Sequence, residues 1–185
     1  MNTKFDNIMI DIETLGAKPG SVICSIAAVE FNIETGQTGR RFFRNINIQS
    51  CLDAGLYVDG STIYWWLNQS DSARSRFQLE KIEFLQALTQ FSHFINASEK
   101  DVKVWGNSAR FDLGILEAAY NKAYSPIPWV AKNERDVRTL VSFAPYIKKN
   151  EPFVGVKHDP IDDCLHQIKY CHKIWNLLVP NVTTI

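Results

Sequence analysis

The chain has 185 residues, of which 45% are hydrophobic and 22% are charged, an ordinary composition for one globular domain that spans residues 1–185. Its 20 lysine and arginine residues balance its 20 acidic residues, which excludes the broad basic surface of proteins that wrap long duplexes. No apolar run approaches the roughly 20 residues of a membrane span, so we expect no membrane partner.

The N-terminal third of the chain has the residue pattern of strands. The predicted strands are Asn7–Ile12, Ser21–Phe31 and Arg41–Ile48. Between the last two, residues Glu34–Gly39 carry two glycines, which predicts the turn of a hairpin.

From Ser61 onward the pattern becomes helical, and Ser61 itself is a candidate N-cap. The further predicted elements are, in chain order, helices Ser61–Asn68 and Glu80–Ala97, a buried strand Asp101–Trp105, a helix Asp112–Ala123, a loop Tyr124–Trp129, a short helix after Asp136 and a helix Pro160–Leu178. Strands followed by helices that alternate with more strands indicate an α/β or α+β domain with a mixed sheet. The order of the strands is not fixed by this pattern.

The four cysteines, Cys24, Cys51, Cys164 and Cys171, lack the paired spacing of a metal site. The last two fall at helical spacing within an apolar pattern, so we expect buried free thiols. Residues 1–6 contain no apolar stretch of the kind that forms a signal peptide. Together these features predict a cytoplasmic location.

Two acidic residues end the first predicted strand. Side chains alternate along a strand, so Ile8, Ile10 and Ile12 point one way while Asp11 and Glu13 point the other, with Cα atoms roughly 6.6 Å apart. Adjacent carboxylates repel each other unless a cation lies between them, and such hard oxygen ligands suit Mg²⁺ or Mn²⁺. The alternative is that both acids are solvated residues of a turn.

A third acid, Asp112, precedes the amphipathic run that predicts the helix Asp112–Ala123. Because aspartate is a good N-cap, capping of this helix is the alternative to metal binding.

The segment before the last helix distinguishes more clearly between acids that cap a helix and acids that are free to bind a metal. Pro160 suits the first helical position, which makes Asp159 the N-cap and places Asp162 near the free N–H groups of the first turn. The apolar stripe of this helix is predicted to be Ile161, Cys164, Leu165, Ile168, Cys171 and Trp175. Asp163 points away from that stripe and has no local structural task, and His158 would overhang the same helix end. A solvated aspartate and a hydrogen-bonded histidine are the alternative.

Together these segments resemble the DEDDh 3′–5′ exonucleases, whose fold is ribonuclease H-like. The family motifs Asp-x-Glu, Asn-x-x-x-(Phe/Tyr)-Asp and His-x-x-x-x-Asp match Asp11–Glu13, Asn107–Asp112 and His158–Asp163, in the same order. Within this superfamily, residues Ser61–Ser70 and Arg135–Thr139 look like the subgroup of small bacterial exoribonucleases and phage exonucleases. The resemblance therefore implies an α/β, ribonuclease H-like mixed sheet flanked by helices.

The resemblance implies a metal-dependent enzyme that releases mononucleotides from the 3′ end of single-stranded RNA or DNA. Asp11, Glu13, Asp112 and Asp163 would hold two ions, Mg²⁺ or Mn²⁺, about 3.5–4 Å apart. His158 would take the proton of the attacking water. The main alternative is an inactive nucleic-acid-binding or partner-binding module, which would be expected to lack at least one of these five residues.

The predicted substrate-binding residues are Thr14, Leu15, Trp65, Asn107 and Phe111. Leu15 would wedge against the terminal base, with a plain hydrophobic contact as the alternative. Trp65 would stack on a base, which contributes about 1–3 kcal/mol, or pack in the core. Asn107 and Phe111 would line the cleft or simply shape a loop.

The expected partner is a single strand with a free 3′ end. The sequence leaves open the choice between RNA and DNA, which depends on one or two contacts to the 2′-hydroxyl. It also leaves open the preferred metal and whether the chain forms a homodimer.

Overall fold

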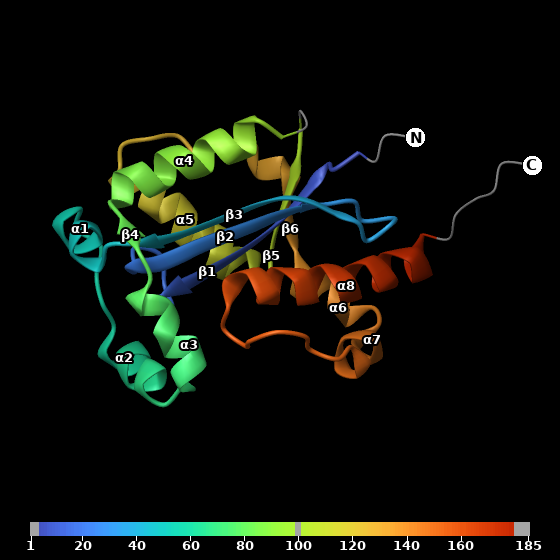
Figure 1. The fold of residues 1–185 in the computed structure, drawn as a ribbon. Coiled ribbons are helices and arrows are strands. Elements are labelled where there is room, and N and C mark those ends of the chain that lie inside the picture. Colours follow the sequence, from blue (N-terminus) through green and yellow to red (C-terminus); the bar gives the residue numbers. More distant parts are fainter. Residues whose placement is uncertain (1–3, 99–100, 180–185) are drawn as a thin grey trace, which may run out of the picture.

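The computed structural model describes residues 4–98 and 101–179. In this part of the chain, six strands form a mixed sheet in the order β4-β3-β2-β1-β5-β6 (Figure 1). The strands are β1 (Asn7–Thr14), β2 (Ile23–Phe31), β3 (Thr38–Ile46), β4 (Lys81–Ile82), β5 (Lys103–Gly106) and β6 (Glu134–Asp136). β2 is antiparallel to both β1 and β3, whereas β5 runs parallel to β1 and β6 parallel to β5. This arrangement confirms the predicted α/β fold with a mixed sheet.

Helices cover both faces of the sheet (Figure 1). They are α1 (Ile48–Asp53), α2 (Gly60–Leu67), α3 (Asp71–Ser75), α4 (Phe84–Asn96), α5 (Ala109–Lys122), α6 (Val137–Ser142), α7 (Pro145–Asn150) and α8 (Pro160–Leu178). One hydrophobic core lies between one face of the sheet and helices α4 and α5. A second lies between the other face and helices α6 and α8. Along β1 the side chains alternate between the two cores, with Ile8 and Ile10 in the first and Met9 in the second.

Several predicted boundaries of helices and strands were wrong, because strand pairing and capping contacts determine where these elements begin. The helix expected from Glu80 begins at Phe84, since Lys81–Ile82 pair with β3 as a two-residue strand. Ser61 is not the N-cap of α2, because the carboxylate of Asp59 accepts a hydrogen bond from the Ser61 N–H at 2.8 Å. A short aspartate side chain two residues upstream therefore starts this helix.

The third strand also differs, running over Thr38–Ile46 in place of the predicted Arg41–Ile48. The hairpin turn closes early, where the Asn32 N–H donates to the Gln37 carbonyl, so pairing with β2 resumes at Thr38. Other predictions hold. Asp159 caps α8, a short helix follows Asp136, and the four cysteines are buried and free.

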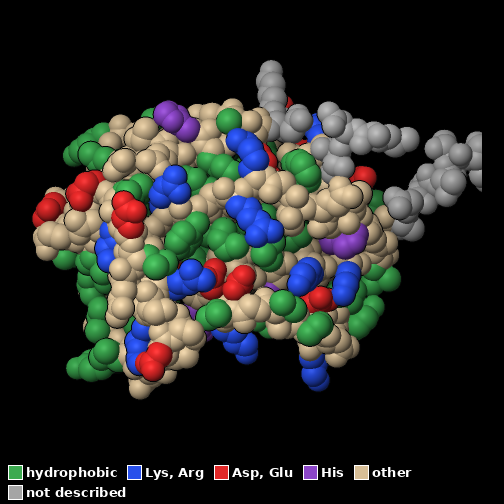
Figure 2. Space-filling model, in the orientation of Figure 1, with side chains coloured by type: hydrophobic (Ala, Val, Ile, Leu, Met, Phe, Trp, Pro, Cys, Tyr) green, Lys and Arg blue, Asp and Glu red, His purple; other side chains and the backbone are tan. Residues whose placement is uncertain are grey.

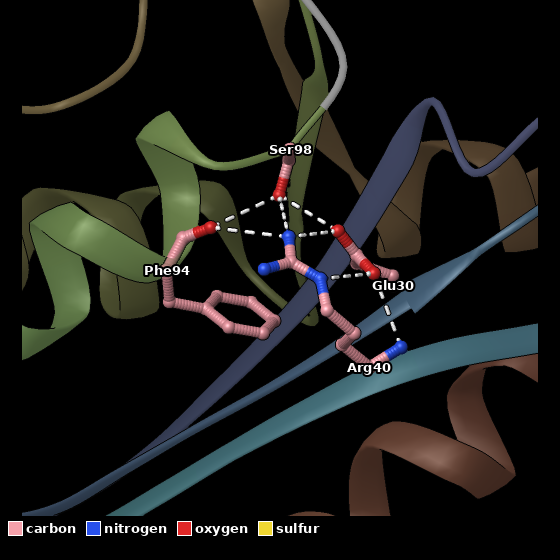
Figure 3. A network of polar contacts seen from close by, with 4 residues as sticks. All are labelled: Glu30, Arg40, Phe94 and Ser98. Carbon is pink, nitrogen blue, oxygen red and sulfur yellow. Dashed lines mark hydrogen bonds and ion pairs between the residues drawn. The ribbon is translucent and has the colours of Figure 1, made fainter.

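A buried carboxylate fastens the β2–β3 hairpin to α4. Glu30 on β2 accepts hydrogen bonds from the Arg40 guanidinium at 2.5 and 3.0 Å and from the Ser98 hydroxyl at 2.8 Å (Figure 3). Burial alone would raise the pKa of Glu30, but these hydrogen bonds lower it overall. Glu30 pairs with Ile8 at the beginning of β1, so this network stabilises the opposite end of the sheet from Asp11 and Glu13.

No helix among residues 4–98 and 101–179 combines the length and the apolar character that crossing a membrane requires.

Candidate active site

The carboxyl end of β1 presents two acids. Asp11 and Glu13 are partly buried and alternate with Ile10 and Ile12, which face the core beneath α4 and α5. The side chains of Asp11 and Glu13 therefore point to the opposite face of the sheet, which α8 covers. Because β5 is parallel to β1, the residues that follow Gly106 reach the same edge of the sheet.

Asp112 approaches β1 from α5. The helix begins at Ala109 with Ser108 at the N-cap position, so the alternative that Asp112 caps it is wrong. Asp112 is 2% exposed and accepts hydrogen bonds from the backbone N–H of Ser108 at 3.2 Å and of Ile12 at 3.4 Å. A Cβ at Gly106 would lie 2.9 Å from the Cβ of Asp112, so a glycine there allows this close approach.

The first turn of α8 brings the last two predicted residues. The Asp159 side chain caps the helix by accepting from the Ile161 N–H at 3.0 Å. Asp163 accepts from the backbone N–H of His158 at 2.9 Å, and His158 has a left-handed backbone with φ of 65°. Ligand atoms of Glu13, His158 and Asp163 all lie within 4.8 Å of one another. The cap and the turn before it thus place a histidine and a carboxylate against β1.

These side chains border one cavity of about 380 Å³. Its walls are Asp11, Ile12, Glu13, Trp65, Asn107, Ser108, Phe111, Asp112, Arg138, His158, Asp163 and Gln167. The structure therefore brings together the five residues predicted to be catalytic and three of those predicted to bind substrate. Their roles remain predictions.

Thr14 and Leu15 do not belong to these walls. The Thr14 hydroxyl donates to the Gly16 carbonyl at 2.7 Å, and Leu15 is 7% exposed within the core, which matches its alternative as a plain hydrophobic contact. A contact of either residue with a nucleotide stays a prediction.

Trp65 was expected either to stack on a base or to pack in the core, and its position has features of both. Its side chain is 43% exposed at the cavity, and its ring packs edge-on against the His158 imidazole with centroids 5.1 Å apart. The neighbouring Trp66 is buried and donates from Nε1 to the Thr14 carbonyl at 2.9 Å, which anchors α2 to β1. Trp65 is thus partly exposed at the cavity and also packs against the histidine.

Four wall residues were not predicted to belong to the site, and two of them, Arg138 and Gln167, lie outside the three matched motifs. Gln167 follows Asp163 by four residues, and this helical spacing could have indicated that both lie on one face of α8. Arg138 lies in the first turn of α6, and no sequence signal places that helix beside β1. The structural reason is Asp136, which caps α6 and also accepts from the Ala109 N–H at 2.8 Å, joining α6 to α5.

Burial and mutual repulsion dominate the electrostatics of the cavity. Burial, followed by the charges of the neighbouring acids, raises the pKa of Asp11 and of Glu13 well above their ordinary values. Burial raises the pKa of Asp112 to about 7 and that of Asp163 to about 6. Burial also lowers the pKa of His158 below 6.5, so its imidazole is neutral near pH 7. Burial thus disfavours the ionised forms of these four carboxylates. A bound divalent cation such as Mg²⁺ or Mn²⁺, which their oxygen donors fit, would stabilise those ionised forms.

The burial of the Asp112 carboxyl group gives a testable dependence of stability on pH. Because the pKa of Asp112 is raised in the folded chain, its contribution to stability is full below its ordinary value of 3.8 and is lost as pH rises through about 7. In the presence of a chelator, the Tm of Asp112→Asn relative to the wild type should therefore increase between pH 4.5 and about pH 7 and level off above that. Thermal melts at several pH values measure this difference, and a difference that stays constant or declines would contradict the raised pKa.

Comparisons with known proteins identify the family of the chain. Residues 6–175 match the family model of the 3′–5′ exoribonuclease Rv2179c-like domain. An exodeoxyribonuclease of Enterobacteria phage T4 is 25% identical over 195 residues, covering 88% of this chain and 86% of the relative.

Solved nuclease structures share the fold. The nuclease domain of 3′hExo, a DEDDh family member bound to rAMP, has a TM-score of 0.62 at 12% identity, covering 95% of this chain and 94% of that one. Exonuclease I of E. coli in complex with a dA16 oligonucleotide has a TM-score of 0.63 at 15% identity, covering 92% of this chain and 40% of that one. These likenesses confirm the predicted ribonuclease H-like fold.

Proposed function

The chain belongs to the family of 3′–5′ exoribonuclease Rv2179c-like domains, and from this premise we propose a two-metal-ion hydrolysis of the 3′-terminal phosphodiester bond of single-stranded RNA or DNA. The observation that carries the proposal is the convergence of four carboxylates and one histidine on a single cavity. Their raised pKa values support it, because a cation bound between the carboxylates would stabilise the ionised forms that burial disfavours. The intact set favours an active enzyme over the inactive module.

Each element of the site has a separate task in this proposal. Asp11, Glu13, Asp112 and Asp163 hold Mg²⁺ or Mn²⁺, which when bound acidifies water and offsets charge on the scissile phosphate. His158, kept neutral by its lowered pKa, accepts the proton of the attacking water at a ring nitrogen. The edge of Trp65 limits the orientations open to that imidazole.

The surface also favours a short contact with one strand. Figure 2 shows lysine and arginine side chains scattered among acidic and apolar ones on the face in view, in keeping with the zero net charge. Such a surface offers little electrostatic attraction to a long duplex. The half-exposed ring of Trp65 can instead stack on an unpaired base at the strand end.

A product analysis tests the substrate part of this proposal. With Mg²⁺ or Mn²⁺, a 5′-labelled linear single strand should shorten one nucleotide at a time from its 3′ hydroxyl. A blunt duplex should be cut more slowly, because each terminal pair must first open at a cost of about 1–2 kcal/mol. A circular single strand should resist, and internal cuts in that circle would rule out an exonuclease. Parallel RNA and DNA substrates show which sugar is preferred.

Arg138 is proposed to contact a substrate phosphate, since it is the one lysine or arginine among the described residues of the cavity wall. Arg138→Ala should raise KM about tenfold with a smaller change in kcat, because a phosphate contact acts in both ground and transition states. It should also reduce the slope of log(kcat/KM) against log salt concentration by about 1. Lys122→Ala, an exposed change at the end of α5, is the matched control. An unchanged slope in Arg138→Ala would remove this residue from the phosphate contacts.

A further inference from the structure

Gln167 is a buried amide at the wall of the acidic cavity. It is 4% exposed and lies one helical turn after Asp163 on α8. Its Nε2 donates a hydrogen bond to Asp11 Oδ1 at 2.9 Å. Its Oε1 is buried and has no hydrogen-bond partner among the residues that the structure describes.

The orientation of this amide follows from its partner. Turning the amide over would place its oxygen against an Asp11 oxygen, and two acceptors repel each other. The NH₂ group therefore belongs on Asp11, and the unpaired acceptor is the other atom. Buried acceptors in folded proteins nearly always have a donor, so an unpaired one at a cavity wall indicates a donor that arrives with a ligand.

The ligand has to satisfy two neighbours at once. Gln167 engages Oδ1 of Asp11, which leaves Oδ2 of this carboxyl group for a cation. Gln167 borders the same cavity, and its buried Oε1 needs an O–H or N–H donor. A hydrated divalent cation provides both, because its charge meets the carboxylate and its water molecules donate hydrogen bonds.

We propose that Gln167 is a positioning residue for the cation at Asp11, a role that rests on the proposed function. The NH₂ group fixes the carboxylate with one oxygen turned to the cation. Oε1 accepts a hydrogen bond from a water molecule in the hydration shell of that cation. Partners of this kind, one step outside the metal ligands, typically change metal affinity by about 10–100-fold when they are removed.

Calorimetric titration of Mn²⁺ into the metal-free protein tests this role without relying on activity. Gln167→Met keeps an unbranched side chain but loses donor and acceptor, so the Kd for Mn²⁺ should rise about 10–100-fold. The control Asn176→Leu also removes a side-chain amide from α8, but that amide donates to the Glu34 carbonyl. Asn176→Leu should bind Mn²⁺ within about twofold of the wild type.

Activity adds a second readout. At limiting Mn²⁺ the rate of Gln167→Met should fall, and raising the Mn²⁺ concentration should restore most of it. Where Gln167→Met fails to fold in a chelator, Gln167→Asn replaces it, since its amide is one methylene too short to reach Asp11 and the same loss of affinity is expected.

The possible outcomes distinguish a failure of the role of Gln167 from a failure of the proposed function. Wild-type affinity for Mn²⁺ in a folded Gln167 variant would overturn the role of Gln167 and leave the proposed function standing. Unchanged Mn²⁺ affinity with a raised KM for RNA but not for DNA would assign Oε1 to a ribose hydroxyl, and it would equally overturn the proposal. A wild-type protein that binds no Mn²⁺ would instead contradict the metal assignment itself.

Discussion

Replacing Asp112 by asparagine is expected to lower the exonuclease rate at least about 10³-fold, which corresponds to about 4 kcal/mol of lost transition-state stabilisation. The carboxylate is 2% exposed and lies among three other acids, so its charge acts where water screens it poorly. An asparagine of the same shape can keep the hydrogen bond from Ser108 or Ile12 but cannot supply the charge. Asp11→Asn should have an effect of similar size.

Single-turnover rates on a labelled strand, with circular dichroism to verify the fold, measure this loss. Asp53→Asn is the matched control, because Asp53 is an exposed residue at the end of α1. Near-normal cleavage by folded Asp112→Asn would remove this residue from the metal ligands.

His158→Ala should lower kcat by about 10²–10⁴-fold, the usual contribution of a positioned general base. Only the neutral imidazole can accept a proton, and burial lowers its pKa below 6.5, so the wild-type rate should fall as pH drops below that value. The variant should lose this acid limb when both proteins are saturated with Mn²⁺. His93→Ala, an exposed change on α4, should keep both the rate and the limb. A His158→Ala enzyme that retains them would move the base to another group.

The sequence predicted the site best where local physics acts alone. Alternation along β1 separated Asp11 and Glu13 from the isoleucines, and the pair Asp159–Pro160 marked the beginning of α8. Asp163, which had no capping or core task in the predicted helix, indeed borders the cavity. In such cases the side-chain period and the capping rule are enough.

Prediction from the sequence failed where contacts between segments far apart in the chain determine the local structure. β4 has two residues and β6 has three, and strands this short exist only because β3 and β5 pair with them. Asp112 resembled an N-cap until the structure placed the helix start at Ala109. Arg138 enters the cavity because α6 is joined to α5, and no periodicity within α6 records that contact.

The most direct test of the metal assignment is anomalous X-ray diffraction from crystals soaked in Mn²⁺ together with a nucleotide product. We predict two Mn²⁺ peaks per chain inside the cavity, bounded by Asp11, Glu13, Asp112 and Asp163, and the loss of at least one peak in Asp112→Asn. Crystals that bind nucleotide in this cavity without any Mn²⁺, or with Mn²⁺ only at other positions, would contradict the two-metal account.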